Sequence, residues 1–258
     1  MRKWILLVFS FLLGMNGYSQ MDTLRIMSFN ILHGATTKND FNLDTIAGVI
    51  NKYKPDLVAL QEVDFKTNRA KNYDLPTEIG IRTHMASLFA RAMYYDGGEY
   101  GEAVLSNLSF IASGNIPLPH QPNSEPRAAL LTRVRTKNGN VIQFVGTHLD
   151  HLEDNTDRLM QAKAINKALG ESKYPTLIVG DLNDGPESET LKILSEHFYK
   201  PQIPEAKYNT WPAEGPEVCL DHILFNMPEH WQILEYEVVC ENYASDHCIV
   251  IATLVFIS

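Results

Sequence analysis

Residues 176–184 read Thr-Leu-Ile-Val-Gly-Asp-Leu-Asn-Asp. The segment starts as a short apolar run rich in β-branched residues, which is typical of a buried strand, and passes at its glycine into residues with hard oxygen atoms. Asp181 and Asn183 lie two residues apart, so on an extended backbone they project from the same face. A carboxylate and an amide placed in this way can bind a hard cation and a substrate oxygen together. The alternative is that Asp181 or Asp184 only caps the next helix.

Two apolar runs near the N-terminus end in the same way. Residues 24–30 finish at Asn30, and residues 57–63 carry Glu62 near their end. Residues 42–53 between them have apolar side chains at helical spacing, which predicts a strand, a helix and a second strand. Such a unit brings its strands parallel and side by side, so Asn30 should lie next to Glu62. A Glu buried without a partner costs roughly several kcal/mol, and its position favours a metal ion over an ion pair.

Three later segments also place acids and histidines at strand ends. They are residues 144–151, residues 219–225 and the tripeptide 245–247, which precedes an apolar closing strand. Oxygen ligands with few histidines and no cysteine suit Mg²⁺, Mn²⁺ or Ca²⁺ better than zinc. The histidines are then free for proton transfer or phosphate binding. The side chains concerned are His148, Asp150, Asp221, Asp246 and His247.

The middle of the chain predicts hairpins. Residues 87–106 surround a Gly-Gly turn, and residues 127–147 surround Asn138-Gly139, a pair that tight hairpin turns favour. This β-rich middle distinguishes the chain from a purely doubly wound fold. With 258 residues, 45% of them hydrophobic, the chain can bury a sizeable core. Since neither a repeat nor a linker is evident, we predict one α/β domain over residues 20–258.

The first nineteen residues have the pattern of a secretory signal peptide. Arg2 and Lys3 precede an apolar run over residues 4–13, and residues 14–19 are small or polar. A retained anchor is the alternative, but about ten apolar residues are short for a bilayer span. We therefore expect export to the periplasm, the cell surface or the medium, without stable membrane insertion after cleavage.

The remaining chain is acidic. Removing residues 1–19 takes away two of the 22 basic residues and none of the 31 acidic ones, which leaves a net charge of −11. An acidic protein is a poor non-specific binder of nucleic acid or anionic membranes. The three cysteines, Cys219, Cys240 and Cys248, allow at most one internal disulfide. We expect all three to be reduced and packed, with a Cys219–Cys240 bridge as the alternative.

Six short segments, in this order, resemble the motifs of the endonuclease/exonuclease/phosphatase superfamily, and the likeness runs from about residue 24 to 257. The superfamily includes pancreatic-type deoxyribonuclease, abasic-site endonucleases, neutral sphingomyelinases and inositol polyphosphate 5-phosphatases. The resemblance, to a bacterial secreted branch, implies a four-layer α/β/β/α sandwich of two mixed sheets. It also implies Mg²⁺- or Mn²⁺-dependent cleavage of a phosphoester by attack of water at phosphorus. The segments are Ser28-Phe29-Asn30, Leu60-Gln61-Glu62, Thr147-His148-Leu149, Gly180-Asp181-Leu182-Asn183, Leu220-Asp221-His222-Ile223 and Ser245-Asp246-His247.

The same resemblance implies metal ligands and water-activating groups. Glu62 would be the principal ligand, with Asn30 beside it and Asp246 assisting. Asp181 would position or deprotonate the attacking water, and Asn183 would hold that water or a phosphate oxygen.

Two histidines complete the implied catalytic set. His247, oriented by Asp221, would contact the phosphate. His148 would protonate the leaving oxygen or bind phosphate, and Glu102, in a Tyr-Gly-Glu segment, would orient it.

The substrate side of the site is less defined by the sequence. Tyr100, Arg127 and Asp150 are candidate substrate contacts, with a surface ion pair and a helix cap as the alternatives for Arg127 and Asp150. Trp211 is expected to anchor a packed loop, with a place in a substrate pocket as the alternative. Five other histidines, His33, His84, His120, His151 and His222, are expected to be surface or packing residues.

Without a basic stripe or an aromatic platform, we favour a small phosphorylated compound or a lipid headgroup as the substrate. A secreted nuclease is the alternative, and a non-catalytic binding module with the same fold is a further one. We expect a monomer.

Overall fold

The computed structural model describes residues 21–202 and 208–257, so the predicted signal peptide lies outside the described residues. The strands form two mixed sheets. One sheet has the order β10 (Trp231–Val239), β11 (Ile249–Ile257), β1 (Met21–Asn30), β2 (Leu57–Phe65), β4 (Gly98–Ser106) and β3 (Ala86–Tyr95). The other has the order β5 (Ser109–Pro117), β6 (Ala128–Arg135), β7 (Val141–His148), β8 (Thr176–Asp181) and β9 (Asp221–Phe225).

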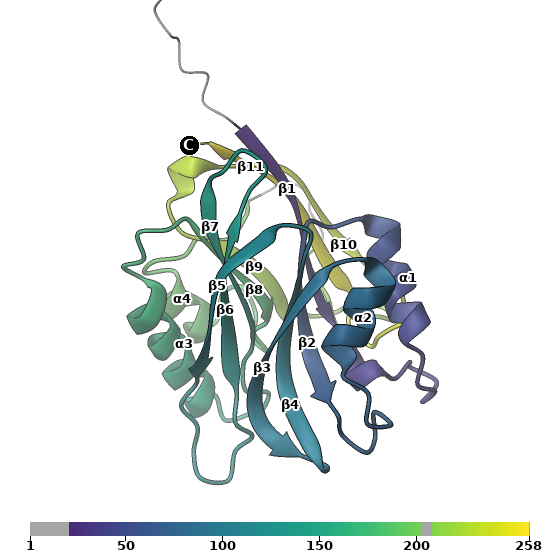
Figure 1. Cartoon of the computed structure of the whole chain (residues 1–258). Coiled ribbons are helices and arrows are strands. Elements are labelled where there is room, and N and C mark those ends of the chain that lie inside the picture. The colour runs from purple at the N-terminus through teal and green to yellow at the C-terminus, as the bar shows by residue number, and fades with distance from the viewer. Residues whose placement is uncertain (1–20, 203–207, 258) are drawn as a thin grey trace, which may run out of the picture.

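Helices cover the outer faces of both sheets (Figure 1). Helices α1 (Leu43–Tyr53) and α2 (Leu75–Thr83) pack on the six-stranded sheet. Helices α3 (Thr156–Leu169) and α4 (Glu189–Leu194) pack on the five-stranded sheet. Two short 3₁₀ turns, η1 (Leu32–Gly34) and η2 (Pro228–His230), complete the described elements. None of the described helices is long and apolar enough to cross a membrane.

Three apolar cores separate the layers. The central core lies between the sheets and includes Phe144 on one side and Val250 on the other. A second core joins Ile46 of α1 to the six-stranded sheet, and a third joins Ile165 of α3 to the five-stranded sheet. Three cores require four layers, so the predicted α/β/β/α sandwich is confirmed.

Parallel strand pairs bring the carboxyl ends of four strands to one end of the sandwich. Helix α1 starts at Asn42, whose side chain caps the helix by accepting from the Thr45 N–H at 3.2 Å. It connects β1 to β2, which run parallel as predicted. Helix α3 connects β7 to β8 in the same way, and the register places His148 beside Asp181. The antiparallel neighbour β9 then sets Asp221 opposite Asp181.

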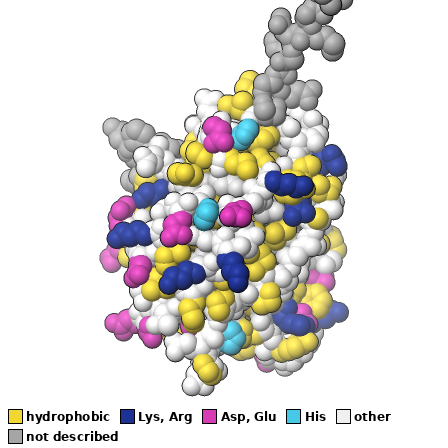
Figure 2. Space-filling view, turned by 90° about the vertical axis from the view of Figure 1, so that its left-hand side faces the viewer, with side chains coloured by type: hydrophobic (Ala, Val, Ile, Leu, Met, Phe, Trp, Pro, Cys, Tyr) yellow, Lys and Arg dark blue, Asp and Glu magenta, His cyan; other side chains and the backbone are white. Residues whose placement is uncertain are grey.

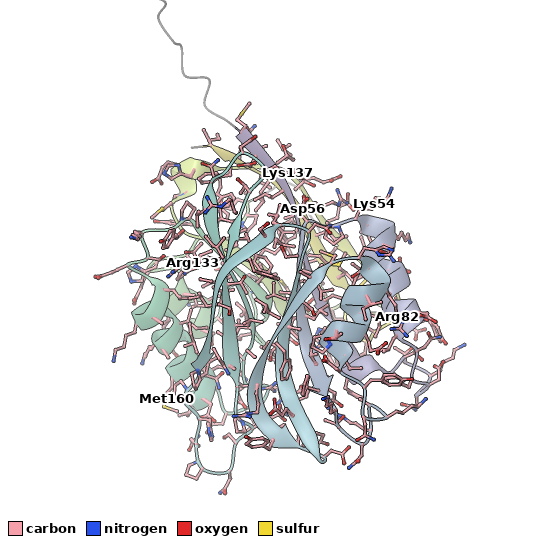
Figure 3. All side chains as sticks on the ribbon, viewed as in Figure 1. Lys54, Asp56, Arg82, Arg133, Lys137 and Met160 are labelled. Atoms are coloured by element: carbon pink, nitrogen blue, oxygen red, sulfur yellow. A yellow bond between two sulfur atoms is a disulfide. The ribbon has the colours of Figure 1, made fainter. Side chains whose placement is uncertain are left out.

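The opposite end of the sandwich is closed by contacts between the sheets. Lys137, in the β6–β7 hairpin, and Asp56, just before β2, are labelled near each other in Figure 3, and their side chains are 3.5 Å apart. Strand β2 starts beside Asp56 and runs away from this end to Glu62. The polar strand ends therefore gather at the far end of the sandwich.

The expectation for the cysteines was wrong. Cys240 and Cys248 form a disulfide, and Cys219 is a free, buried thiol. The two bridged residues adjoin the last residue pair of the β10–β11 ladder, Val239 and Ile249, so they face each other across neighbouring strands. The bridge closes the loop of residues 241–247, which includes Asp246 and His247.

Candidate active site

Asn30 joins the acidic groups of the two sheets. Its side-chain nitrogen is 3.1 Å from Glu62 Oε1 and 3.3 Å from Asp181 Oδ2. Asn30 and Asp181 are buried, while the Glu62 side chain is 24% exposed and 3.6 Å from His33. Burial opposes the charge on Glu62, but hydrogen bonds from His33 and Asn30 outweigh it and lower its pKa. Glu62 is therefore an anion at the mouth of the site.

An irregularity in β2 directs Glu62 into the site. The β2–β4 register shifts between Leu60 and Val63, and Glu62 has a φ of 56°, in the left-handed region that is unusual for this residue type. Gln61 is fully buried and hydrogen-bonds Ser28. Residues held in such conformations cluster at functional sites.

Gly180 allows the two central strands of the site to approach each other. A Cβ atom at this position would lie 1.9 Å from the carbonyl oxygen of Thr147. Directly after it, the Asp181 carboxylate accepts the backbone N–H of Asn183 at 2.9 Å. This turn is why a Gly-Asp-Leu-Asn sequence presents both polar side chains at the strand end.

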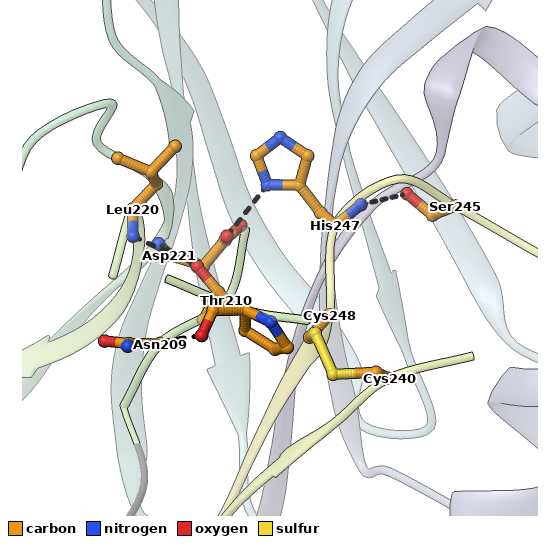
Figure 4. The surroundings of a disulfide bond; sticks show 9 residues. Asn209, Thr210, Leu220, Asp221, Cys240, Ser245, His247 and Cys248 are labelled. Atoms are coloured by element: carbon orange, nitrogen blue, oxygen red, sulfur yellow. Dashed lines mark hydrogen bonds and ion pairs between the residues drawn. A yellow bond between two sulfur atoms is a disulfide. The ribbon is translucent and has the colours of Figure 1, made fainter. Parts of the chain in front are cut away.

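His247 and Asp221 form a hydrogen-bonded pair. The distance between His247 Nδ1 and Asp221 Oδ2 is 2.9 Å, and Thr210 Oγ1 accepts the Asp221 backbone N–H (Figure 4). Burial alone would lower the pKa of His247, but the charge and hydrogen bond of Asp221, followed by Asp181 and Asp246, raise it to about 10. His247 is therefore an imidazolium whose other nitrogen, Nε2, is 3.6 Å from Asp181 Oδ2.

Asp181, in contrast to the charged His247, tends to be neutral. Burial and repulsion from Asp221 raise the pKa of its carboxyl to about 7, and His247 offsets only part of this shift. The neighbouring carboxylates of Asp181 and Asp221 therefore share a proton near neutral pH unless additional positive charge is present.

Arg127, rather than Glu102, contacts His148. The guanidinium nitrogen Nη1 is 3.0 Å from His148 Nδ1, which acts as the acceptor because a guanidinium only donates. Nε2 therefore carries the proton and lies 3.5 Å from Asp181 Oδ2, an acceptor, and 2.9 Å from the side-chain amide of Asn183. Burial and the charge of Arg127 lower the pKa of His148 well below its usual value, so the imidazole is neutral.

Glu102 is fully buried and, within the described residues, neither carboxylate oxygen has a hydrogen-bond partner. Burial raises its pKa well above the usual value, which indicates a protonated carboxyl. The expected hydrogen bond from Glu102 to His148 is therefore not formed. Glu102 lies on β4, in the six-stranded sheet. Arg127 immediately precedes β6, which pairs with β7, the strand that carries His148.

The candidate substrate residues are buried. Arg127 is 3% exposed and also contacts Glu125 and His151, each at 3.1 Å, so the surface ion pair is excluded. Asp150 is fully buried and accepts the Leu152 N–H at 3.0 Å, while α3 starts after Asn155. Asp150 is thus not the cap of that helix.

Several of these groups line one cavity of about 480 Å³, whereas Asn30, Asp221 and Asp246 are not among its lining residues. It contains residues that the sequence had indicated as catalytic, together with Tyr100 and Arg127. Trp211 also lines it and is 41% exposed, so the expectation of a packed anchor was wrong. Asp150 and Glu102 do not line it. The lining residues are His33, Glu62, Arg69, Met93, Tyr95, Tyr100, Glu125, Arg127, His148, His151, Asp181, Asn183, Trp211, Leu220 and His247.

Comparison with known proteins identifies the family. The sequence model of the endonuclease/exonuclease/phosphatase family matches residues 27–247. The chain belongs to this family.

Solved structures of family members and related enzymes share the fold. An endonuclease/exonuclease/phosphatase protein from Beutenbergia cavernae has a TM-score of 0.77 at 19% identity, over 91% of this chain and 72% of that one. A mannosyl-6-phosphatase from Bacteroides thetaiotaomicron has a TM-score of 0.72 at 17% identity, over 90% and 100%. D. rerio TDP2, solved with a single-stranded DNA product, has a TM-score of 0.69 at 17% identity, over 90% and 98%. These structures show that the fold is shared, whereas membership of the endonuclease/exonuclease/phosphatase family makes the chain a hydrolase that acts on phosphoester bonds.

Enzymes of the endonuclease/exonuclease/phosphatase family depend on a metal ion, and the donor set of this chain fits one. Glu62 is anionic, and Asp246 is half-buried with a buried oxygen, Oδ1, that has no hydrogen-bond partner in the described chain. A second possible group, formed by atoms of Asp181, Asp221 and His247 within 4.8 Å of one another, also lies here. Asp221 and His247 of this group are already bonded to each other. A hard divalent cation suits these oxygen donors.

Several lining residues escaped the sequence analysis. Arg69 and Tyr95 carry no motif, and His33 and His151 were expected to be surface or packing residues. His222, in contrast, is buried and contacts the Asp184 carbonyl oxygen at 2.9 Å, as expected of a packing residue. The Glu125-Pro126-Arg127 segment resembles a bacterial branch of the family, but only Arg127 of this segment was predicted to contact the substrate.

Proposed function

We propose that the protein is an exported phosphoesterase that uses Mg²⁺ or Mn²⁺ to hydrolyse a small phosphorylated compound or a lipid headgroup. The observation that carries the proposal is the convergence of Glu62, Asp181 and His247 on one cavity. Its volume of about 480 Å³ is within the range of small-molecule sites, roughly 300–1,000 Å³. Export is supported by the signal-like residues 1–19.

Each group has a role that its surroundings support. Glu62, Asn30 and Asp246 would hold the cation, which when bound neutralises the charge that develops on the phosphoryl oxygens. Asp181 takes the proton of the attacking water, and its high pKa makes it a better base than an exposed Asp.

The histidines act on the other side of the phosphate. His247 donates a hydrogen bond from Nε2 to a phosphoryl oxygen while Nδ1 stays bonded to Asp221. His148 is neutral and presents its Nε2–H toward the reacting atoms. This group stabilises the leaving oxygen by a hydrogen bond, and a neutral imidazole does not act as the general acid that the resemblance implied as one role of His148.

A nuclease is the second candidate, because TDP2 was solved with a DNA product. The net charge of the chain does not favour it. On the face shown in Figure 2, Lys and Arg side chains alternate with acids and apolar groups rather than forming a basic stripe.

Hydrolysis assays distinguish these candidates. Wild-type protein would be tested with phenyl phosphate, bis-p-nitrophenyl phosphate, sugar phosphates, a lipid headgroup diester and single-stranded DNA, each with Mg²⁺, Mn²⁺ or EDTA. We expect metal-dependent hydrolysis of the small esters at a higher kcat/KM than DNA. Faster cleavage of DNA would favour the nuclease, and no hydrolysis of any ester by a folded, metal-loaded protein would refute the proposal.

A further inference from the structure

Arg69 is held rigidly at the cavity wall. It lies seven residues after Glu62, and its Nε and Nη2 donate to the two oxygens of Asp64 at 2.7 and 2.9 Å. Asp64 is fully buried and also accepts from Thr67 at 2.6 Å, so the acceptor is fixed as well. The guanidinium carbon lies 4.6 Å from the ring centre of Tyr95 and 5.5 Å from that of Tyr100. Such a guanidinium has little freedom left to lose when it binds a ligand.

One nitrogen of Arg69 remains available. In the described residues Nη1 has no hydrogen-bond partner, while the side chain is 32% exposed and lines the cavity. None of the catalytic roles above uses Arg69. Asp64, Tyr95 and Tyr100 hold the guanidinium in place, and its remaining N–H groups can donate hydrogen bonds to a ligand in the cavity.

Aromatic surfaces line the same cavity. Trp211 and Tyr95 are 41% and 40% exposed, although Arg69 and Tyr100 lie against the Tyr95 ring. The exposed surface of these two rings can contact the apolar face of a ring that enters the cavity.

The charge of this wall is balanced. Arg69 is paired with Asp64, and Arg127 is paired with Glu125. A second phosphate on the ligand would meet these carboxylates as well as the arginines, so the wall does not favour another anion. Paired N–H donors and carboxylate acceptors instead suit hydroxyl groups, which both donate and accept.

We propose that Arg69, Tyr95 and Trp211 form the specificity wall of the active site and bind the polyhydroxylated ring of a phosphorylated sugar or cyclitol. The proposal rests on the phosphoesterase function proposed above and adds the substrate class and the residues that select it. The phosphoryl group occupies the catalytic end, the ring face stacks on the aromatic side chains, and its hydroxyls bond Arg69 and the Arg127–Glu125 pair.

The test compares two substrates that both carry a ring. A hexose 6-phosphate or an inositol monophosphate has hydroxyls, whereas phenyl phosphate has none. The ratio of their kcat/KM values measures hydroxyl recognition, and kcat/KM on phenyl phosphate separately measures whether the protein is a phosphoesterase. We expect a ratio well above one in the wild type, since a site built to bond hydroxyls discriminates strongly against analogues that lack them.

Arg69→Lys keeps a positive charge next to buried Asp64 but loses the fixed fork. We expect it to lower the ratio by about 10- to 100-fold, the effect of losing hydrogen bonds from a charged donor. Trp211→Ala, which leaves Asp64 paired, should lower kcat/KM for the hexose phosphate by about tenfold and serves as the second variant if Arg69→Lys does not fold.

Arg91 provides the matched control. It stacks 4.1 Å from the Tyr94 ring centre and pairs with Glu99 at 2.8 Å, yet it does not line the cavity. Arg91→Lys should leave both kcat/KM values unchanged. A ratio near one in the wild type, a ratio unaltered in both variants, or a clear preference for nucleoside monophosphates would overturn the specificity wall. Failure of the wild type on every ester would instead refute the phosphoesterase.

Discussion

Replacing Asp221 by Asn tests the charge state of His247. The substitution keeps the size of the side chain but removes the negative charge that most raises the pKa of His247 to about 10. At pH 7.5 a histidine with that pKa is almost fully protonated. If its pKa falls to about 6.5, the ordinary value, only about a tenth of the molecules carry the imidazolium.

We therefore expect Asp221→Asn to lower kcat/KM at pH 7.5 by about tenfold through protonation alone. The loss should shrink toward pH 5.5, where a histidine with a pKa of about 6.5 is protonated again in about nine molecules of ten. The assay is hydrolysis of phenyl phosphate at saturating Mg²⁺, with wild type and variant compared at each pH between 5.5 and 8.5. Circular dichroism verifies that the variant is folded.

The ratio of variant to wild-type activity is the decisive quantity, because titrating groups remote from Asp221 affect both proteins alike. The substitution also removes the repulsion from Asp221 that raises the pKa of Asp181, so activity above pH 7 is compared separately. In the variant, burial lowers the pKa of His247 while the charges of Asp181 and Asp246 raise it, so the pH at which activity recovers reports the balance of these effects. A ratio that stays constant over this pH range would show that Asp221 does not act by keeping His247 charged.

Three further outcomes follow from the described contacts. Asp181→Ala and His247→Ala should each lower kcat at least about 100-fold while circular dichroism shows a folded protein; an unchanged kcat in either would remove the role given to that residue. The double change Cys240→Ala and Cys248→Ala should lower the free energy of unfolding by about 2.5 kcal/mol, from the separation of eight residues between the cysteines, and chemical denaturation would measure it. An equal stability of this variant and the oxidised wild type would contradict the bridge. Mg²⁺ should raise the melting temperature more at pH 8 than at pH 6. The pKa of Asp181 is raised to about 7 in the folded protein, so its protonated form stabilises the metal-free protein at low pH. This stability is lost as the pH rises through about 7. Above that pH the cation no longer competes with a proton on Asp181. A larger shift at pH 6 would contradict this linkage.

The parts of the fold that follow a local rule were predictable. The β1–α1–β2 unit combines a helical apolar period, an Asn cap and two apolar strands, and the handedness and length of such units leave little choice but parallel neighbours. That rule also predicted that Asn30 and Glu62 would meet. The prediction that Asp181 and Asp221 lie together came from the resemblance to the family, because β9 is antiparallel and no local pattern sets its register.

Other features depend on tertiary contacts that a linear pattern does not contain. Glu62 points into the site because β2 is irregular after Leu60, and no residue type in that segment requires the irregularity. Arg127 reaches His148 because β6 pairs with β7, whereas Glu102 lies on the other sheet. The disulfide depends on the β10–β11 register, which brings Cys240 and Cys248 together across the strand pair. Loop residues such as Trp211 have no periodic environment from which exposure could be inferred.

Binding of Mn²⁺ to wild type and to Glu62→Gln tests the central claim most directly, because it measures the cation site without requiring a substrate. Titration calorimetry or electron paramagnetic resonance would follow binding at pH 8, with Glu241→Gln, at a surface ion pair with Lys52, as the control for loss of one acid. We predict that the wild type and Glu241→Gln bind Mn²⁺ with the same affinity and that Glu62→Gln loses at least about tenfold. Equal affinity in all three proteins would show that the ends of β1, β2 and β8 do not assemble a metal site around Glu62.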